Sequence, residues 1–304
     1  MSPIRKPKIQ SQFRTIDGLS IRFAESEQRD DHALLFCPWP ESVYAYEAIW
    51  DRLAERTHLV AVDLPGFGRS ERRDALMSPQ AMGEFIVRVA DSFGLEWPHV
   101  VAPDVGTGAA LFAAALHPGR LRTLTIGTGG AAVPLQLGGV LKEWVEAPDL
   151  EPYRKIDGRE VVKRVMETLD QYRPTDAARE DYLASYAGDR FAESMRYVRT
   201  YPKQLPLLAG LLPGIRTPVQ IIQGEHDRVV PPVNGRFLRA RLPNSTLHTI
   251  IDAGHFIWED AADLYADLIT RWWDGGYVMP RQSVSTMARP LTHTNVQLPP
   301  LHWN

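Results

Sequence analysis

The sequence is poor in several features on which whole classes of protein depend. It has a single cysteine, Cys37, so it cannot form an internal disulfide, and a reducing, cytoplasmic location is expected. No apolar run approaches the roughly 18 residues that a transmembrane helix needs, and the N-terminus lacks the apolar segment of a secretory signal. We therefore expect a soluble protein that has no membrane as a partner.

An excess of positive charge is also missing. The chain has 34 Lys and Arg against 37 Asp and Glu, which gives a net charge of -3 and no basic field to hold phosphates. Nucleic acid is therefore not an expected partner. No glycine-rich phosphate loop or clustered metal-ligand motif is present, so the sequence predicts no cofactor and no metal. Small, largely neutral substrates fit this charge balance best, and a homodimer is left open.

The composition that is present suits one large α/β domain with an insertion, because 44% of the 304 residues are hydrophobic and 23% are charged. Asp17-Gly18 is a strong turn dipeptide and predicts an antiparallel hairpin from residues 13–16 and 19–24. After it, short apolar runs that are typical of buried strands alternate with segments of helical spacing. The runs occupy residues 33–37, 59–62, 100–102, 121–126, 219–223 and 246–251. This alternation indicates βαβ units and a mostly parallel central sheet.

The alternation stops over residues 131–212, which are charged, helical in pattern and hold six of the ten tyrosines. We interpret this segment as an inserted helical lid, or cap. Residues 1–130 and 213–274 would then form the core. Residues 275–304 contain Gly-Gly and several prolines without periodicity, so they are predicted to be an irregular C-terminal tail.

The strongest chemical motif lies at residues 100–108, where a buried strand meets a small residue, an acid, a glycine and then a helix. Such a strand-turn-helix elbow needs small residues two before and two after its central residue, and Ala102 and Gly106 meet that demand. The elbow would lift the side chain of Asp104 above the sheet. A plain helix N-cap is the alternative interpretation of Asp104.

Two later segments make the catalytic interpretation the stronger one. Asp227 follows the strand at 219–223, and His255 follows the strand at 246–251, so the chain order is Asp104, Asp227, His255. Nucleophile, acid and histidine occur in this order in α/β-hydrolases. A satisfied structural histidine is the alternative for His255. Glu225 and Asp252 are neighbouring acids that we interpret as solvated turn residues.

With these motifs, the chain resembles the α/β-hydrolase superfamily over about residues 10–275, including Val62-Asp63-Leu64-Pro65-Gly66-Phe67-Gly68-Arg69-Ser70 before the elbow. Because the elbow holds Asp in place of Ser, the sequence is similar to the branch of epoxide hydrolases and haloalkane dehalogenases. The resemblance implies the α/β-hydrolase fold and an alkyl ester on Asp104. It also implies that His255, oriented by Asp227, is the base that activates water, and that the backbone N-H groups of Trp39 and Val105 form the oxyanion hole.

A carboxylate suits this position because it can displace an alkoxide or halide from an sp³ carbon and leave an ester that water can cleave. The loop Cys37-Pro38-Trp39-Pro40 keeps only the last residue of the family pattern, and Pro38 removes one N-H donor and restricts Cys37. The oxyanion loop is therefore expected to differ in shape. Cys37 itself is interpreted as a small buried hydrophobe.

The group that stabilises the leaving atom is less clearly indicated. Many relatives carry Trp after the nucleophile, where dehalogenases use its indole on the halide, so Val105 counts against dehalogenation. Epoxide opening needs a hydrogen-bond donor, which relatives supply as two lid tyrosines. Tyr197 lies near the second of these, and Trp144 or Tyr153 near the first. Simple packing is the alternative for each of these lid aromatic residues.

The sequence therefore predicts an epoxide hydrolase-like enzyme, a hydrolase acting on ether bonds, that adds water to an oxirane through an aspartyl ester. The alternatives are a haloalkane dehalogenase, an ester or lactone hydrolase in which Asp104 and His255 activate water directly, and a catalytically silent binding protein on the same scaffold. The aromatic residues of the lid indicate a small, largely apolar organic substrate.

Overall fold

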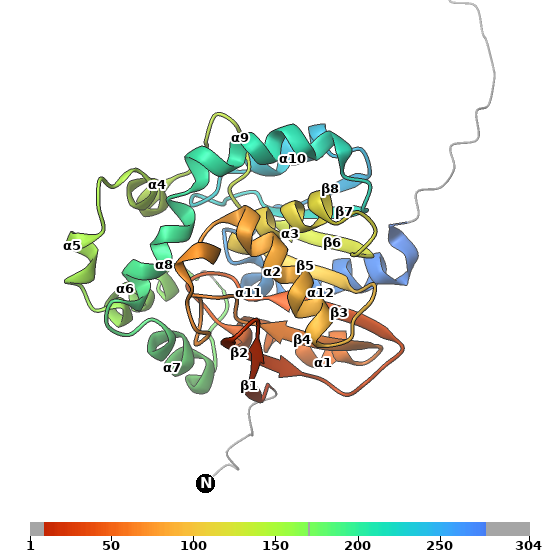
Figure 1. Ribbon diagram of the computed structural model, residues 1–304, viewed down its shortest axis with the longest axis horizontal. Helices are drawn as coiled ribbons and strands as arrows, with labels where there is room; N and C mark the ends of the chain where they lie inside the picture. The colour runs from red at the N-terminus through yellow and green to blue at the C-terminus, as the bar shows by residue number, and fades with distance from the viewer. Residues whose placement is uncertain (1–8, 170, 278–304) are drawn as a thin grey trace, which may run out of the picture.

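A computed structural model describes residues 9–169 and 171–277. These residues form an eight-stranded sheet in the order β1-β2-β4-β3-β5-β6-β7-β8 (Figure 1). β1 and β2 pair antiparallel, as do β2 and β4, and the pairs from β4 to β8 are parallel. The strands are β1 (Ser11–Ile16), β2 (Leu19–Glu25), β3 (Asp31–Phe36), β4 (Thr57–Val62), β5 (His99–Pro103), β6 (Thr123–Gly127), β7 (Val219–Gly224) and β8 (Ser245–Ile250). The mostly parallel central sheet that the sequence predicts is confirmed.

The local rules behind these strands are simple. In the β1-β2 hairpin, Asp17 and Gly18 both have positive φ, at 51° and 75°, which a tight two-residue hairpin turn requires. In β4, every residue from Thr57 to Val62 is buried, as expected of a strand that is covered on both faces. The apolar runs that lack alternation were therefore sufficient to predict the central strands.

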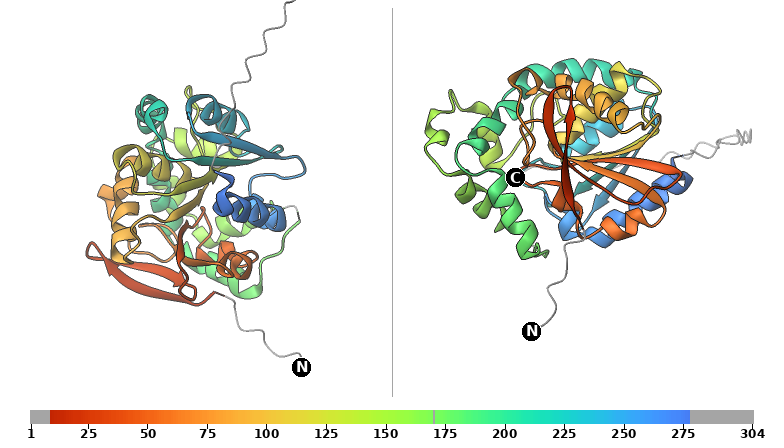
Figure 2. Two further views of the ribbon diagram at one scale, coloured as in Figure 1. Left: turned by 90° about the vertical axis from the view of Figure 1, so that its right-hand side faces the viewer. Right: turned by 60° about the horizontal axis from the view of Figure 1, so that its bottom comes forward.

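Helices cover both faces of the sheet (Figures 1 and 2). One face packs on α2 (Pro79–Ser92), α3 (Val105–Leu116) and α10 (Val233–Arg241), and the other on η1 (Val43–Tyr46), α1 (Trp50–Ala54), α11 (Ile257–Asp260) and α12 (Ala262–Arg271). Two short elements, η2 (Asp74–Leu76) and the π-helix η4 (Trp272–Gly276), complete the core. Residues 47–49 separate η1 from α1, and Ala261 separates α11 from α12. Residues 278–304 of the predicted tail lie outside the described residues.

Between β6 and β7 the described chain is mostly helical, with α4 to α8 at the left of Figure 1 and α9 along its top. This helical insertion consists of α4 (Gly139–Glu146), α5 (Glu151–Arg154), α6 (Gly158–Met166), α7 (Asp176–Ser185), α8 (Arg190–Val198), α9 (Tyr201–Leu211) and η3 (Leu212–Gly214). We use the word lid for it. Part of the lid is fastened to the core by a buried ion pair, in which both terminal nitrogens of Arg22 donate to the carboxylate of Asp181 at 2.7 and 2.9 Å. The remaining guanidinium nitrogen, Nε, donates to Asp63 at 2.5 Å.

Candidate active site

Asp104 occupies the turn between β5 and α3, at the carboxyl end of the parallel strands. Its backbone is strained, with φ 51° and ψ -123°, and its side chain makes no helix-capping hydrogen bond. The turn is crowded, since a Cβ on Gly106 would lie 3.0 Å from that of Ala102, and one on Gly129 would lie 2.4 Å from the Asp104 carbonyl oxygen. The elbow is therefore formed as the small residues predicted, and the N-cap alternative for Asp104 is wrong.

The two oxygens of the Asp104 carboxylate have different surroundings. Oδ2 accepts a hydrogen bond of 2.7 Å from the backbone N-H of Trp39, and the N-H of Val105 also donates to this carboxylate. Oδ1 lies 3.8 Å from Nε2 of His255. The loop after β3 thus provides its N-H donor at Trp39 in spite of Pro38, whose missing N-H is not needed there. Oδ2 is held by the N-H of Trp39, and Oδ1 faces the histidine.

His255 and Asp227 are brought together by the turns after β8 and β7. Nδ1 of His255 lies 2.9 Å from Oδ2 of Asp227, while Oδ1 of Asp227 accepts from the N-H groups of Val229 and Val230 at 2.9 and 2.8 Å. This holds the imidazole with Nε2 toward Asp104. The rival acids Glu225 and Asp252 are both exposed. The structure therefore places His255 between the two carboxylates, with a hydrogen bond to Asp227 and a closely placed oxygen of Asp104.

Burial changes the ionisation of this group of residues. Asp104 is 5% exposed, and loss of solvation raises its pKa to about 6, although the nearby His255 and the two backbone donors oppose the rise. Burial acts to lower the pKa of His255, but the charge and hydrogen bond of Asp227 outweigh burial and raise it. At neutral pH Asp104 is consequently mostly ionised.

A small cavity of about 90 Å³ lies over Asp104 and is almost wholly apolar. Its floor comes from the core and its roof from the α4 and α6 region of the lid. It is lined by Trp39, Pro40, Asp104, Val140, Leu141, Trp144, Val165, Thr168, Val229, His255 and Phe256. The sequence had indicated only Trp39, Asp104, Trp144 and His255. The spacing of Val140, Leu141 and Trp144 indicates an apolar helix face but not what that face covers.

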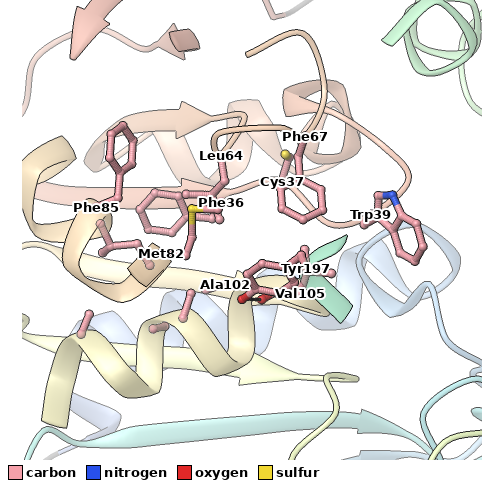
Figure 3. Packing of buried hydrophobic residues seen from close by; sticks show 14 of the residues in the cluster. Phe36, Cys37, Trp39, Leu64, Phe67, Met82, Phe85, Ala102, Val105 and Tyr197 are labelled. Carbon is pink, nitrogen blue, oxygen red and sulfur yellow. Dashed lines mark hydrogen bonds between the residues drawn. The ribbon is translucent and has the colours of Figure 1, made fainter. Parts of the chain in front are cut away.

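The three lid aromatics predicted as donors have different positions. Trp144 lines the cavity and packs edge-on against Trp39, with ring centroids 5.3 Å apart. Tyr153 is half-buried and is not among the cavity-lining residues. Tyr197 is fully buried and donates its hydroxyl hydrogen to the backbone carbonyl of Val105 at 2.8 Å, beneath the elbow rather than inside the cavity (Figure 3). Of the three, only Trp144 lines the cavity over Asp104.

Two further residues, Gln223 and Cys37, lie next to the site in the structure. Gln223, 1% exposed in β7, donates from Nε2 to Oδ2 of Asp227 at 3.1 Å, and a polar residue in an otherwise apolar strand was the available signal for it. Cys37 is fully buried beside the oxyanion loop, and this burial raises the pKa of its thiol well above the usual value. It is the inert core residue expected, as Figure 3 illustrates.

Among residues 9–169 and 171–277, no three His, Cys, Asp or Glu side chains come close enough to hold a metal ion. In the same part of the chain, no helix has the length and apolar character needed to cross a bilayer. The site consists of a carboxylate, an imidazole and backbone donors under an apolar roof.

Comparison with known proteins identifies the family. Residues 33–262 match the family model described as the alpha/beta hydrolase fold. The chain therefore belongs to the α/β-hydrolase family. It is 29% identical over 225 residues to 2-hydroxy-6-oxononadienedioate/2-hydroxy-6-oxononatrienedioate hydrolase 2 of Pseudomonas putida, covering 69% of this chain and 74% of the relative. It is 25% identical over 232 residues to the 2-hydroxymuconate semialdehyde hydrolase of the same species, covering 72% and 77%.

Solved structures show the same fold at lower sequence identity. The epoxide hydrolase CorEH has a TM-score of 0.74 at 18% identity, covering 88% of this chain and 99% of that one. A single-substitution mutant of the meta-cleavage product hydrolase CumD has a TM-score of 0.69 at 20% identity, covering 86% and 97%. Proteins with similar backbones are named for different reactions. The comparisons therefore support hydrolysis at the level of the family but do not identify the bond that is cleaved.

Proposed function

We propose that this α/β-hydrolase-fold protein opens oxirane rings by adding water through a covalent ester on Asp104. The observation that carries the proposal is the unequal placement of the two Asp104 oxygens. Oδ1, which faces the cavity and His255, attacks a ring carbon as the C-O bond breaks and its electron pair passes to the ring oxygen. Oδ2, bound by the N-H of Trp39, becomes the carbonyl oxygen of the ester.

The second half of the reaction uses the same geometry. His255, oriented by Asp227, takes a proton from a water molecule that attacks the Cγ atom of the Asp104 ester. The negative charge that develops on Oδ2 is stabilised by the donors already in place at Trp39 and Val105. As this intermediate collapses, the bond between Cγ and Oδ1 breaks and His255 returns its proton to Oδ1. The diol leaves with Oδ1, and the oxygen of water stays in the carboxylate.

The leaving oxygen receives its hydrogen bond from Trp144 in this proposal. Trp144 lines the cavity, and among the described residues no hydrogen bond occupies its indole N-H. An indole can donate a hydrogen bond but cannot give up its proton at neutral pH, so the alkoxide takes its proton from water. A small, apolar epoxide fits this cavity, whose lining in the described part of the chain includes no arginine or lysine.

Halide displacement is the second candidate, and the position of Trp144 favours it. A departing halide needs directed N-H donors and no proton, which is what an indole supplies. Val105 counts against this reaction because the elbow contributes no second indole. The same Asp104 ester and His255 base would serve both reactions, so the two candidates differ only in the leaving atom.

Cleavage at an acyl carbon by water that Asp104 and His255 activate is a third candidate, which the names of the sequence relatives favour. The substrate in the name of the first relative is a nine-carbon dicarboxylate. A cavity of about 90 Å³ without a lining arginine or lysine gives such a dianion neither room nor a counter-charge. We therefore place this reaction below displacement at an sp³ carbon.

One experiment separates these candidates. His255→Gln is incubated with panels of small epoxides, haloalkanes and esters, and intact-protein mass spectrometry follows adducts, with Asp104→Asn as the matched control. The proposal expects a whole-epoxide adduct that maps to Asp104 and is missing in the control. In a single wild-type turnover in ¹⁸O water, the label should enter Asp104 and not the diol. Label in the product alone would indicate direct water attack, and lack of turnover by any panel would indicate a binding protein.

A further inference from the structure

Two carboxyl groups that the proposed reaction does not use lie next to each other behind the site. Glu41 is 2% exposed and follows the oxyanion donor Trp39 by two residues. Glu259 is 3% exposed, lies in α11 and follows His255 by four residues. The two carboxyl groups lie within hydrogen-bonding reach of each other. They therefore connect the loop of the oxyanion donor with the turn of the histidine.

The hydrogen bonds around Glu41 and Glu259 limit the number of protons that the pair can hold. The indole N-H of Trp258 donates to Oε2 of Glu41 at 2.8 Å, and the hydroxyl of Tyr182 donates to Oε1 of Glu259 at 3.0 Å. Oε2 of Glu259 is buried and, in the described residues, receives no hydrogen bond from an N-H or hydroxyl group. Two carboxylates cannot bond to each other without a proton between them. A proton on Glu41 that is donated to Glu259 satisfies this set of groups.

The local charges act in the same direction. Burial, the charge of Glu259 and their mutual hydrogen bond hold the pKa of Glu41 well above its usual range. Burial likewise raises the pKa of Glu259, to about 7. The carboxyl groups of Glu47, Asp104 and Asp260 and the phenols of Tyr46, Tyr172 and Tyr182 interact electrostatically with the pair. A second negative charge on the pair would thus be both poorly solvated and repelled.

We propose that Glu41 and Glu259 share one proton and that the resulting carboxyl-carboxylate bond positions the Trp39 loop against the His255 turn. The N-H of Trp39 holds one oxygen of Asp104, and His255 faces the other. A bond between their two supporting segments therefore sets the distance between oxyanion donor and base. Trp258 adds to this connection, since its ring lies 6.0 Å from that of His255 and its N-H binds Glu41.

Glu41 and Glu259 are positioning residues in this proposal, because neither lines the cavity over Asp104. Their effect on turnover depends on the function proposed above, whereas the shared proton does not. The proton can therefore be tested without a substrate, and failure of one proposal is distinguishable from failure of the other.

The shared proton is tested by infrared spectroscopy at pH 8, where the carbonyl stretch of a protonated carboxyl is rare in a protein. Wild type should show this band, and Glu41→Gln should lose it, because the amide donates to Glu259 without a titrating proton. Asp104→Asn is the control and should keep the band. A wild-type spectrum without the band, or a band that survives in Glu41→Gln, would overturn the proposal.

The positioning role is tested by comparing two substitutions of Glu41. Glu41→Leu removes both hydrogen bonds and should lower kcat by up to roughly 10²-fold with little change in KM, the effect expected of a misplaced base and oxyanion donor. Glu41→Gln keeps both bonds and should restore most of kcat. It should also abolish the fall in activity at the alkaline pH where the wild-type pair loses its proton. Equal kcat in the two variants, or an unchanged alkaline limb in Glu41→Gln, would contradict the role.

Discussion

The floor and the roof of the cavity over Asp104 are held in different ways. On the floor, Asp104 and Asp227 are bound by backbone N-H groups, from Trp39 on one side and from Val229 and Val230 on the other. On the roof, Val140 and its neighbours in α4 contribute apolar side chains, and Val140 is 51% exposed. Backbone donors fix Asp104 and Asp227 in place, whereas the roof, apart from Trp144, can change its side chains without moving either carboxylate.

The lid repeats this contrast within itself. Its α7 and α8 region is fastened to the core through Arg22 with Asp181, and through the hydroxyl of Tyr197 on the Val105 carbonyl. The α4 and α6 region meets the core across the cavity, where Trp144 and Val165 supply packing. We therefore expect access to the cavity to depend on α4 and α6, with the fastened region acting as their support.

The largest effect is expected at the floor, from Asp104→Asn. The amide is isosteric but cannot displace an alkoxide, so turnover should fall by at least about 10⁴-fold while the fold is kept. Circular dichroism and steady-state rates on an epoxide check this together. Substantial remaining turnover in a sample free of deamidation would move the nucleophile elsewhere and remove the distinction between floor and roof.

The next effect concerns the fastened part of the lid. Asp181→Leu removes one of the two carboxylates that bind the buried guanidinium of Arg22 and leaves only Asp63. It should lower the free energy of unfolding by roughly 3 kcal/mol. Urea denaturation measures this change. Asp176→Leu, at an exposed position of the same helix, is the matched control and should change stability little. Similar losses in both variants would show that the Arg22 pair is not the fastening.

The pH dependence of the ester-forming step tests the floor electrostatically. Because the pKa of Asp104 is raised to about 6, the carboxylate form predominates above that pH and the protonated, non-nucleophilic form below it. Adduct formation in His255→Gln should therefore fall about tenfold per pH unit below the Asp104 pKa. This substitution removes the opposing charge of His255, so the midpoint should lie at or above pH 6. Rapid-quench mass spectrometry follows the step, and a midpoint near the ordinary aspartate pKa of about 4 would mean that Asp104 is well solvated.

The smallest effect is expected at the roof and compares two aromatic residues. Trp144→Phe removes the cavity N-H and should slow ester formation by about tenfold, the value of one hydrogen bond. Tyr197→Phe removes only the hydrogen bond to the Val105 carbonyl. It should lower the free energy of unfolding by about 1 kcal/mol and change the rate of ester formation little. Rapid-quench rates and thermal unfolding are measured for both. A slower step in Tyr197→Phe than in Trp144→Phe would return the donor role to the tyrosine.

Much of the floor could be read from local sequence. The apolar strands, the Ala102 and Gly106 spacing around Asp104, and the order of Asp227 and His255 are all properties of short segments. Parallel strands bring their carboxyl ends to one edge of a sheet, so residues that follow different strands meet there without further information. The order of the segments was therefore enough to predict which side chains would come together.

The roof was decided by tertiary structure alone. In the sequence, Tyr197 and Trp144 are both aromatic residues of the lid. In the structure, the hydroxyl of Tyr197 donates to the carbonyl of Val105, whereas Trp144 lines the cavity. Glu41 and Glu259, which lie together in the structure, are 218 residues apart in the sequence. Helical periodicity shows which face of a lid helix is buried, but the contact made by that face depends on how the helices pack on the core. That packing is a long-range property, and no short segment of the sequence contains it.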